Sequence, residues 1–405
     1  MDKNKPQHHQ INLPTGFLSP VALELFDVLN TNGTQSLFVG GCVRDAVLGE
    51  VAHDIDLATP LTPDETTAAL KTAGFKVEPT GLSHGTVMAI KDGEAYEVTT
   101  LRKDISTDGR HAEVAFTDDF REDAARRDFT FNAMYMDKTG QVTDYFGGLE
   151  DLKNGRLRFV GEPATRLKED WLRALRFIRF YGRFATRKPE AGTLSALKAA
   201  APELTSLSAE RITTEVFKTA LTRYPAQAFY LMQDLGYWDA LGLGGFSVAG
   251  FEKYINAFPA SDDALALMVA GLWQADPGVL IKTTHLRLSN QQKKRVRALC
   301  PENITRLDPD NVPYSCWLMS ADNAVALWRL ESVFGPNKAA AKAAFKKAEA
   351  IEVPPFPLGG EDLARLGYEK GPAMGAALKK TEAWWAESGF PDKQKCLAYV
   401  QDNTP

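Results

Sequence analysis

The sequence predicts an α+β protein: an N-terminal head with a small mixed β-sheet, followed by an elongated all-α neck, body and tail. Two observations predict this class. Short β-prone runs, separated by Gly and Asp, are confined to about the first 145 residues. After Gly148 the strand signals largely disappear, and apolar residues recur at helical spacing in one segment after another. We therefore expect one sheet-containing domain followed by helices.

The head should contain both strands and helices. Its β-prone runs predict strands at 36–39, 55–58, 86–90, 95–101 and 112–117. Apolar residues at helical spacing, followed by a glycine stop, predict helices at 21–33, 43–49 and 63–74.

The remainder should be helical throughout. Amphipathic spacing predicts helices at 164–184, 191–200, 208–222, 226–235, 251–256, 263–274, 291–299, 321–334, 338–349 and 360–366. The Pro-rich stretch 353–360 is the best linker candidate. We therefore expect four parts: a head at 20–146, a neck at 147–222, a body at 223–352 and a tail at 353–405.

Composition excludes several classes of protein. The 405 residues include 47 Lys and Arg against 52 Asp and Glu, a net charge of −5, and 44% are hydrophobic. Such a chain is neither disordered nor suited to coating nucleic acid through bulk charge. The charge is uneven, however, because ten basic residues stand against three acidic ones between Arg156 and Lys188.

Cysteines and apolar runs predict the compartment. The four cysteines form no CxxC pair, which argues against a disulfide framework or a zinc site. The N-terminus has no apolar signal region, and the longest apolar run, 264–273, is about half the ~20 residues needed to span a bilayer. We expect neither secretion nor membrane insertion, and a reducing cytoplasm fits best.

A double glycine marks the first candidate site. In LFVGGCVRDAVLG, at 37–49, a short apolar strand is followed by Gly40 and Gly41 and then by a helix. Glycines at such a junction let backbone N–H groups approach a phosphate closely. Gly40 and Gly41 are therefore candidate phosphate-binding residues, although a double glycine is often only a turn.

Paired acids follow ten residues after Arg44. Asp54 and Asp56 are separated by one residue in a β-prone run, so a period of two places both carboxylates on one face. Two close like charges suit Mg²⁺, which is bound through a few carboxylates and substrate phosphates. Glu97, in a later strand, could supply a third carboxylate. Acids in this arrangement can hold two metals for in-line displacement at a nucleotide α-phosphorus.

Eight segments, in this order, carry a family resemblance: GGCVRD, DIDLAT, SHGTV, YEVTTLR, DGRHAEVAF, RRDFTFNA, DYFGGLEDL and EDWLRALRFIRF. The order resembles that of class II tRNA nucleotidyltransferases, the CCA-adding enzymes, which have bacterial poly(A) polymerases as close relatives. Dense matches cover 37–183, and weaker ones follow at LSAERITTE (207–215) and at 360–378. The resemblance implies a nucleotidyltransferase head and helical RNA-binding parts.

The resemblance also assigns residues. It implies that Asp128 reads the ribose 2′-OH, that Asp170 and Arg173 read the base, and that further arginines contact the nucleotide. The nucleotide-binding set is then Gly40, Gly41, Arg44, Arg127, Asp128, Asp170, Arg173, Arg176 and Arg179, and the catalytic set is Asp54, Asp56 and Glu97. The loop DGRHAEVAF, at 108–116, resembles one that family members need in order to add A after C.

The base-reading assignment has a physical reason. A carboxylate beside a guanidinium offers an acceptor next to a donor, which matches the amine and ring nitrogen of cytosine or adenine. Uracil and guanine present the reverse pattern, and an unpaired buried polar group costs ~1–3 kcal/mol. Asp170 and Arg173 recur with Arg176 and Arg179 every three residues, which predicts a ridge along one helix. Such a pair accepts C and A and refuses U and G.

The function expected is template-independent addition of C, C and A to the 3′ end of tRNA, from CTP and ATP, with Mg²⁺ and release of pyrophosphate. One alternative is a poly(A) polymerase, which would share nearly every motif. Another is a non-catalytic RNA-binding protein on the same scaffold, although the intact acids argue against it. Docking on the tRNA acceptor and TΨC arms is expected through phosphate contacts from Lys293, Lys294, Arg295 and Arg297, and from the lysines between Lys338 and Lys347.

Overall fold

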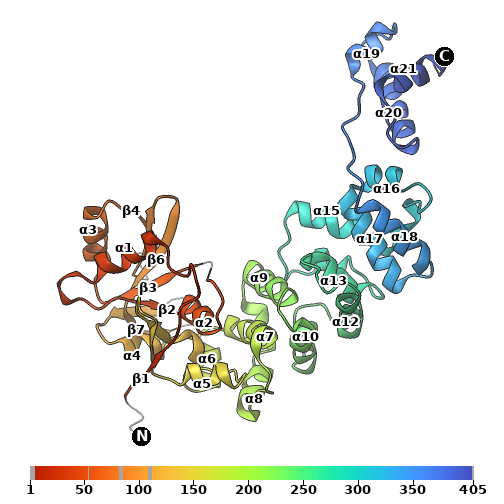
Figure 1. The fold of residues 1–405 in the computed structure, drawn as a ribbon. Coiled ribbons are helices and arrows are strands. Elements are labelled where there is room, and N and C mark those ends of the chain that lie inside the picture. The colour runs from red at the N-terminus through yellow and green to blue at the C-terminus, as the bar shows by residue number, and fades with distance from the viewer. Residues whose placement is uncertain (1–4, 53, 82–84, 108–111, 404–405) are drawn as a thin grey trace. The chain divides into compact units, whose positions relative to one another are not determined.

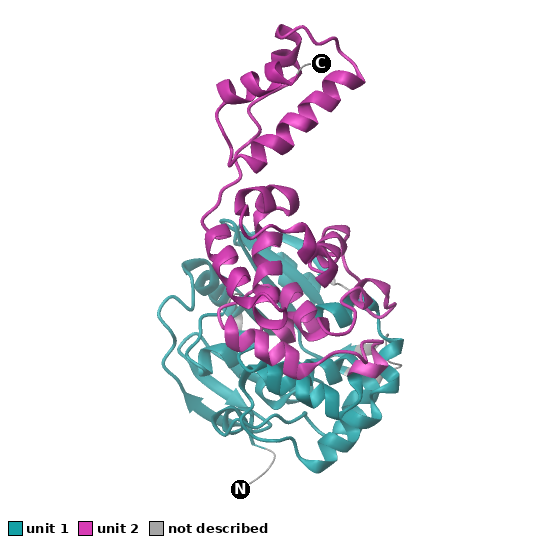
Figure 2. Cartoon of the chain, turned by 90° about the vertical axis from the view of Figure 1, so that its right-hand side faces the viewer, with its two compact units in different colours: residues 1–215, 222–237 teal, residues 216–221, 238–405 magenta. Residues whose placement is uncertain are grey.

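The computed structural model describes residues 5–52, 54–81, 85–107 and 112–403. The chain forms two compact units, one of residues 1–215 and 222–237 and the other of residues 216–221 and 238–405 (Figure 2). The four-part division into head, neck, body and tail stays a prediction, because these units divide the chain differently. Each unit is described by itself below.

The first unit contains the sheet (Figure 1). Eight strands lie in the order β1-β10-β9-β2-β3-β6-β5-β4, and β7 and β8 form a separate hairpin. Among the strand pairs of the described residues, β3–β6 alone is parallel, so the sheet is mixed as expected. The strands are β1 Gln7–Gln10, β2 Leu37–Val39, β3 Asp56–Thr59, β4 Lys76–Gly81, β5 Thr86–Lys91, β6 Glu94–Thr100, β7 Arg102–Thr107, β8 Ala112–Phe116, β9 Met134–Met136 and β10 Gln141–Asp144.

Local sequence explains where several head helices begin. The Ser19 hydroxyl accepts a hydrogen bond from the Ala22 amide, and Pro20 occupies the first turn of α1. Thr62 and Glu65 form a reciprocal capping box at the start of α3. The helices of this unit are α1 Pro20–Leu29, α2 Gly41–Val47, α3 Pro63–Thr72, α4 Phe120–Ala125, α5 Gly148–Lys153, α6 Pro163–Glu169, α7 Leu172–Phe184, α8 Ala191–Ala199 and α10 Pro225–Asp234, and α9 Ala209–Ala220 runs from this unit into the other.

The single helix predicted at 164–184 is wrong. The structure contains two helices, α6 and α7, separated by Asp170 and Trp171. Asp170 has an extended backbone with φ −155° and ψ 106°, and its Oδ1 accepts a hydrogen bond from the Leu172 amide at 3.0 Å. An Asp side chain that bonds to the backbone in this way competes with the helix, so the ladder restarts after it. Asp170 therefore precedes the arginine ridge instead of belonging to it.

Aromatic packing fixes α7 against the segment that follows Asp128. The ring of Phe131 lies 5.1 Å from that of Phe180 and 4.8 Å from that of Phe184, and Phe129 stacks on Phe131 at 5.4 Å. Aromatic pairs of this kind contribute beyond the area that they bury. Asp128 and the arginines of α7 are therefore held at a fixed spacing by a shared core.

The second unit is helical in its described residues. Its apolar run at 264–273 forms α13, which is buried along its length, so it is a core helix. In the part of the chain that the structure describes, no helix is both long and apolar enough to cross a membrane. The helices are α11 Tyr237–Ala240, which begins at the boundary, α12 Val248–Ala257, α13 Ala264–Leu272, α14 Val279–Lys282, α15 Asn290–Ala298, α16 Val312–Met319, α17 Ala321–Phe334, α18 Lys338–Ala348, α19 Gly360–Arg365, α20 Pro372–Glu387 and α21 Lys393–Asp402.

Candidate active site

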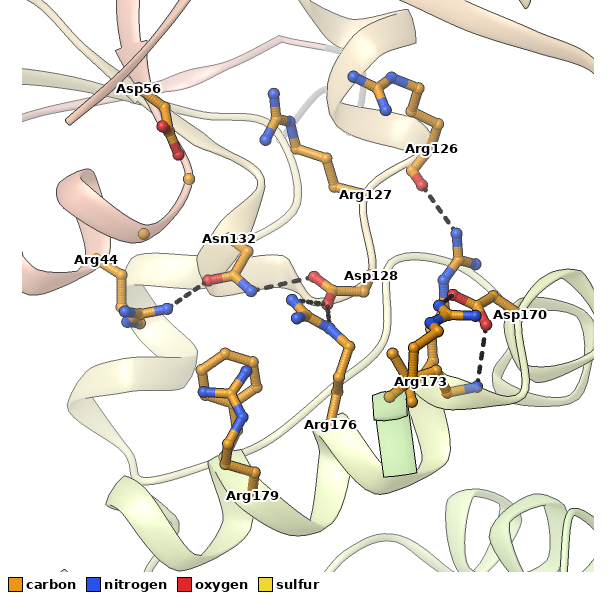
Figure 3. A pocket seen from close by; sticks show the side chains of 15 residues that line it. Arg44, Asp56, Arg126, Arg127, Asp128, Asn132, Asp170, Arg173, Arg176 and Arg179 are labelled. Atoms are coloured by element: carbon orange, nitrogen blue, oxygen red, sulfur yellow. Dashed lines mark hydrogen bonds and ion pairs between the residues drawn. The ribbon is translucent and has the colours of Figure 1, made fainter. Parts of the chain in front are cut away.

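One pocket of about 520 Å³ in the first unit contains most of the predicted site (Figure 3). All nine residues predicted to bind nucleotide line it, together with Asp56. Seven arginines and three aspartates make the lining strongly polar and basic. The lining residues are Gly40, Gly41, Arg44, Asp56, Arg126, Arg127, Asp128, Asn132, Asp170, Leu172, Arg173, Arg176, Arg179, Phe180 and Arg211.

The glycine turn forms one wall. Gly40 joins β2 to α2 with φ 76° and ψ −122°, a conformation that side chains rarely adopt. A Cβ added there would lie 3.4 Å from Nη1 of Arg127. Glycine at this position therefore lets the backbone turn sharply beside an arginine, and leaves room in front of both.

A chain of hydrogen bonds crosses the floor of the pocket (Figure 3). Arg44 donates through Nη1 to the Asn132 amide oxygen at 2.9 Å, and Asn132 Nδ2 donates to Asp128 Oδ1 at 3.1 Å. Arg176 donates through Nε to Asp128 Oδ2 at 2.7 Å. Burial would raise the pKa of Asp128, but Arg176 and these hydrogen bonds hold that pKa below its ordinary value. Asp128 is therefore an ionised acceptor.

The carboxylate of Asp123 binds two of the lining arginines, Arg126 and Arg127. This carboxylate is 1% exposed and accepts from Arg126 Nε at 2.8 Å, from Arg127 Nη2 at 2.9 Å and from the Tyr135 hydroxyl at 2.7 Å. Burial favours the neutral acid, yet the two arginines and the hydroxyl hold the pKa of Asp123 well below its usual range. The same contact raises the pKa of Arg127 against the effect of burial. Asp123 thus fixes a permanently charged Arg127 at the pocket.

The arginines of α7 face the pocket in a row. Arg176 binds Asp128, and Arg179 donates through Nε to Glu215 Oε2 at 2.7 Å. The Arg179 guanidinium also lies 4.2 Å from the centre of the Phe180 ring, a favourable cation–π arrangement. Each arginine is therefore held along one side and can still donate to an anion in the cavity.

The two residues predicted to read the base are held by other groups. Asp170 Oδ2 accepts from Arg211 Nη2 at 2.8 Å. Arg173 donates through Nη1 to the Arg166 carbonyl at 3.0 Å and pairs with Glu169, and through Nη2 it contacts the Arg126 carbonyl at 3.4 Å. Asp170 and Arg173 do not pair with each other in these contacts. The acceptor and the donor are therefore oriented by different protein groups.

The predicted catalytic acids are only partly brought together. Asp56 begins β3 and lines the pocket, whereas Asp54 lies two residues before the strand and is exposed. The expectation that one strand face carries both acids is therefore wrong, because only Asp56 belongs to the strand. Glu97 is the register partner of Asp56 across the parallel pair β3–β6, and it is exposed. Neither Asp54 nor Glu97 lines the pocket.

The two neighbouring acids nevertheless act on Asp56. Burial, and then the charges of Glu97 and Asp54, raise the pKa of Asp56 to about 6, although Arg127 acts in the opposite direction. The described residues contain no group of three or more His, Cys, Asp or Glu side chains arranged to hold a metal ion. The chemistry of the acids fits a hard divalent cation bound through few carboxylates and completed by substrate oxygens.

Several lining residues were not assigned from the sequence. Asn132 lies in RRDFTFNA and Arg211 in LSAERITTE, both of which were noticed only as parts of the resemblance. Leu172 and Phe180 belong to α7, where apolar residues at this spacing predict only packing. The predicted loop at 108–116 is described only from Ala112, where β8 begins, and Asp108 to His111 lie outside the described residues.

The predicted RNA-binding residues lie in the second unit, on α15. Ser289 and Gln292 form a capping box at its start. Lys294 and Arg297 are exposed and Lys293 is half-buried. Arg295 instead pairs with Asp263 and donates through Nη1 to the Asn323 side chain at 3.1 Å. Arg295 is thus committed to packing within its own unit.

The fold and pocket define a class. In this fold, the neighbouring strands β3 and β6 carry Asp56 and Glu97, and the arginines of a following helix line a cavity large enough for a nucleotide. This is the arrangement of a nucleotidyltransferase. Two family models match the chain: the "Poly A polymerase head domain" over residues 36–158 and the "Probable RNA and SrmB- binding site of polymerase A" over residues 188–241.

Known proteins narrow the class to a family. The human protein named CCA tRNA nucleotidyltransferase 1, mitochondrial, is 32% identical, over 96% of this chain and 95% of its own length. A CCA-adding enzyme of Streptococcus gordonii is 31% identical, over 96% of this chain and 98% of its own. The solved structure of the Bacillus stearothermophilus CCA-adding enzyme in complex with CTP has a TM-score of 0.73 and 28% identity, covering 95% of this chain and 98% of that one. The chain belongs to the class II CCA-adding tRNA nucleotidyltransferase family.

Proposed function

We propose that this protein adds C, C and A to the 3′ end of tRNA, using CTP and ATP. The observation that carries the proposal is one pocket lined by Asp56, Asp128, Asp170 and a row of arginines. The RNA 3′-OH would attack the α-phosphorus of the bound nucleotide, and pyrophosphate would leave. Family members named for this activity match nearly the whole chain.

Mg²⁺ is the proposed cofactor, and Asp54 and Asp56 are its proposed ligands. The raised pKa of Asp56 supports this assignment, because acids that repel one another gain from a cation. A bound pair of such ions would neutralise the attacking and leaving oxygens of an in-line displacement. Glu97, beside Asp56 across the parallel strand pair, would help to position the primer hydroxyl or the metal.

The remaining lining residues would bind and orient the nucleotide. Arg127, Arg176 and Arg179 are proposed to contact the triphosphate, with Arg44 and the turn at Gly40 and Gly41 completing this side of the site. The ionised Asp128 would accept a hydrogen bond from the ribose 2′-OH, which favours ribonucleotides. Positioning and charge neutralisation suffice for such a transfer, without a covalent intermediate.

Asp170 and Arg173 would select the base. A fixed carboxylate acceptor beside a fixed guanidinium donor matches C and A, and opposes U and G. The contacts of both residues with other protein groups support this role, because each is oriented before a nucleotide arrives.

The direct test is to sequence RNA 3′ ends after incubation with Mg²⁺, CTP and ATP, singly and together. The substrates are tRNA that ends at the discriminator base and an unstructured RNA of equal length. We expect discrete CCA on the tRNA alone, and arrest after two C residues when ATP is omitted. Long A tails on either RNA would favour a poly(A) polymerase, and RNA binding without any addition would favour a non-catalytic protein.

Contacts with the acceptor and TΨC arms are proposed for α15. Lys294 and Arg297 are exposed on it, and Lys293 adds a third charge, whereas Arg295 serves its own unit. We expect the double change Lys294→Ala and Arg297→Ala to weaken tRNA binding and to reduce the salt slope of the binding constant by about 2. Titration at several salt concentrations measures both.

The matched control for this change is Lys71→Ala with Lys76→Ala, which removes two exposed charges from the head. The control should leave the salt slope unchanged. An unchanged slope in the α15 variant would contradict the assignment of this helix to phosphate contacts.

We propose the cytoplasm as the compartment. All four cysteines are buried and unpaired, as in proteins of reducing compartments. The animal relatives carry the word mitochondrial in their names, whereas the bacterial CCA-adding enzymes do not.

A further inference from the structure

Helix α9 holds two pocket residues through two charged side chains of its own, which lie one turn apart. Arg211 and Glu215 are separated by four positions and therefore share one face of the helix. Arg211 lines the pocket and binds Asp170 Oδ2 at 2.8 Å, and the buried Glu215 binds Arg179 Nε at 2.7 Å. A helix outside the arginine row thus holds two residues of the proposed nucleotide site.

The contact with Arg211 matters most because Asp170 lies between two helices. Its extended backbone is not part of a continuous helical ladder, so the side chain needs other restraints. Two hydrogen bonds from described residues provide them: the Leu172 amide binds Oδ1 at 3.0 Å, and Arg211 binds Oδ2 at 2.8 Å. Each carboxylate oxygen can accept more than one hydrogen bond, so both restraints leave lone pairs for a base.

Without Arg211, a competing partner lies nearby. The charge of Asp170 already acts on Arg176, which helps to raise the pKa of that guanidinium. A carboxylate freed on one oxygen could turn towards the arginines of α7. Its acceptor would then be used inside the protein and would no longer face the base.

We propose that Arg211 is a specificity-determining positioning residue, which holds the Asp170 carboxylate in the orientation that admits C and A and rejects U and G. This inference rests on the proposed function, because it needs Asp170 to read the base. Arg211 acts through Asp170 and need not touch the nucleotide. Glu215 orients Arg179 in the same way, on the side of the site proposed to bind phosphate.

The experiment compares Arg211→Met, Arg211→Lys and the unmodified protein. Methionine keeps most of the length and removes the charge, whereas lysine keeps the charge but lacks the planar fork. The control is Lys218→Met, which removes an exposed positive charge from the same helix. For each protein, kcat/KM is measured with CTP and with UTP on tRNA that lacks CCA, together with the melting temperature.

We expect Arg211→Met to lower the CTP-to-UTP ratio of kcat/KM by about tenfold. A misoriented Asp170 carboxylate would no longer leave an unpaired polar group when uracil binds, and the cost of that unpaired group is what rejects U. Arg211→Lys should restore part of the ratio, and Lys218→Met should leave it unchanged. The melting temperature should change little, because the Arg211–Asp170 pair is partly exposed, with side chains 44% and 28% accessible.

An unchanged ratio in a folded Arg211→Met protein would overturn the inference, and so would an equal loss of activity with both nucleotides. If Arg211→Met does not fold, Arg211→Gln is measured in its place, with the same ratio deciding. Failure of the unmodified protein to incorporate CMP would overturn the proposed function itself, which separates the two failures.

Discussion

Replacing Asp56 by Asn is expected to slow nucleotide transfer by at least about 100-fold while tRNA binding is retained. Asp56 is the strand acid that lines the pocket, and its neighbours Asp54 and Glu97 act on it electrostatically. The amide cannot carry the charge that a divalent cation needs. Single-turnover addition of CMP to tRNA lacking CCA, measured at saturating enzyme, separates this loss from any change in binding.

The same substitution should not destabilise the protein. A raised pKa means that the folded state disfavours the charged form, so ionised Asp56 costs stability above its folded pKa of about 6. In metal-free buffer at pH 8, the Asn variant should melt at the same temperature as the unmodified protein or higher. Asp118→Asn, a change at an exposed acid in the same unit, is the control for activity. Near-normal transfer by the Asp56 variant would remove this residue from the proposed metal site.

Replacing Asp123 by Asn is expected to destabilise the protein by about 3–5 kcal/mol, because it leaves two arginines without their buried partner. Arg126 and Arg127 both bind the Asp123 carboxylate, and the Tyr135 hydroxyl on β9 donates to it. One change therefore loosens α4, β9 and the pocket together. Chemical denaturation monitored by circular dichroism measures the loss, and nucleotide affinity should fall with it.

Acid titration is a second test of the contribution of the Asp123 charge to stability. Its pKa is depressed in the folded state, so its contribution is present above the unfolded pKa of about 3.9 and is lost as the pH falls through the folded pKa. The unmodified protein should therefore lose stability below about pH 4, and the gap between it and the Asn variant should narrow there. Asp118→Asn should track the unmodified protein across this range. A gap that stayed constant with pH would contradict a role for the charge.

The fold was predictable where burial imposes a period. The strands β2, β3, β5, β6 and β8 and most of the predicted helices lie within a few residues of their predicted positions, whereas helices such as α4, α5, α16, α20 and α21 were not predicted. Five strands were missed, β1, β4, β7, β9 and β10, and three of them differ in physical character from the predicted ones. β1 is the polar segment QHHQ at the sheet edge, β4 contains a proline, and β9 is a three-residue strand that is buried on both faces. Such strands are set by backbone pairing, which leaves no alternation in the sequence.

The site was predictable only in part, for a similar reason. The nine predicted nucleotide-binding residues and Asp56 line one pocket, whereas Asp54 and Glu97 do not, and the roles of all of them remain proposals. Asp123 could have been found, because it stands three and four residues before Arg126 and Arg127, at the end of α4, a spacing at which side chains meet. Arg211 could not, since its partner Asp170 is 41 positions away. Only the folded chain brings them together.

The edge strand β1 has a practical consequence for handling the protein. Residues 7–10 pair with 141–144, and so they cover the backbone of β10 at one border of the sheet. A shortened chain that began after residue 11 would expose that border, where unpaired amides and carbonyls can join the strand of another molecule. Trimming these few polar residues should therefore promote aggregation during purification, although they contribute almost nothing to the core. An affinity tag at this end should be separated from Gln7 by a flexible spacer.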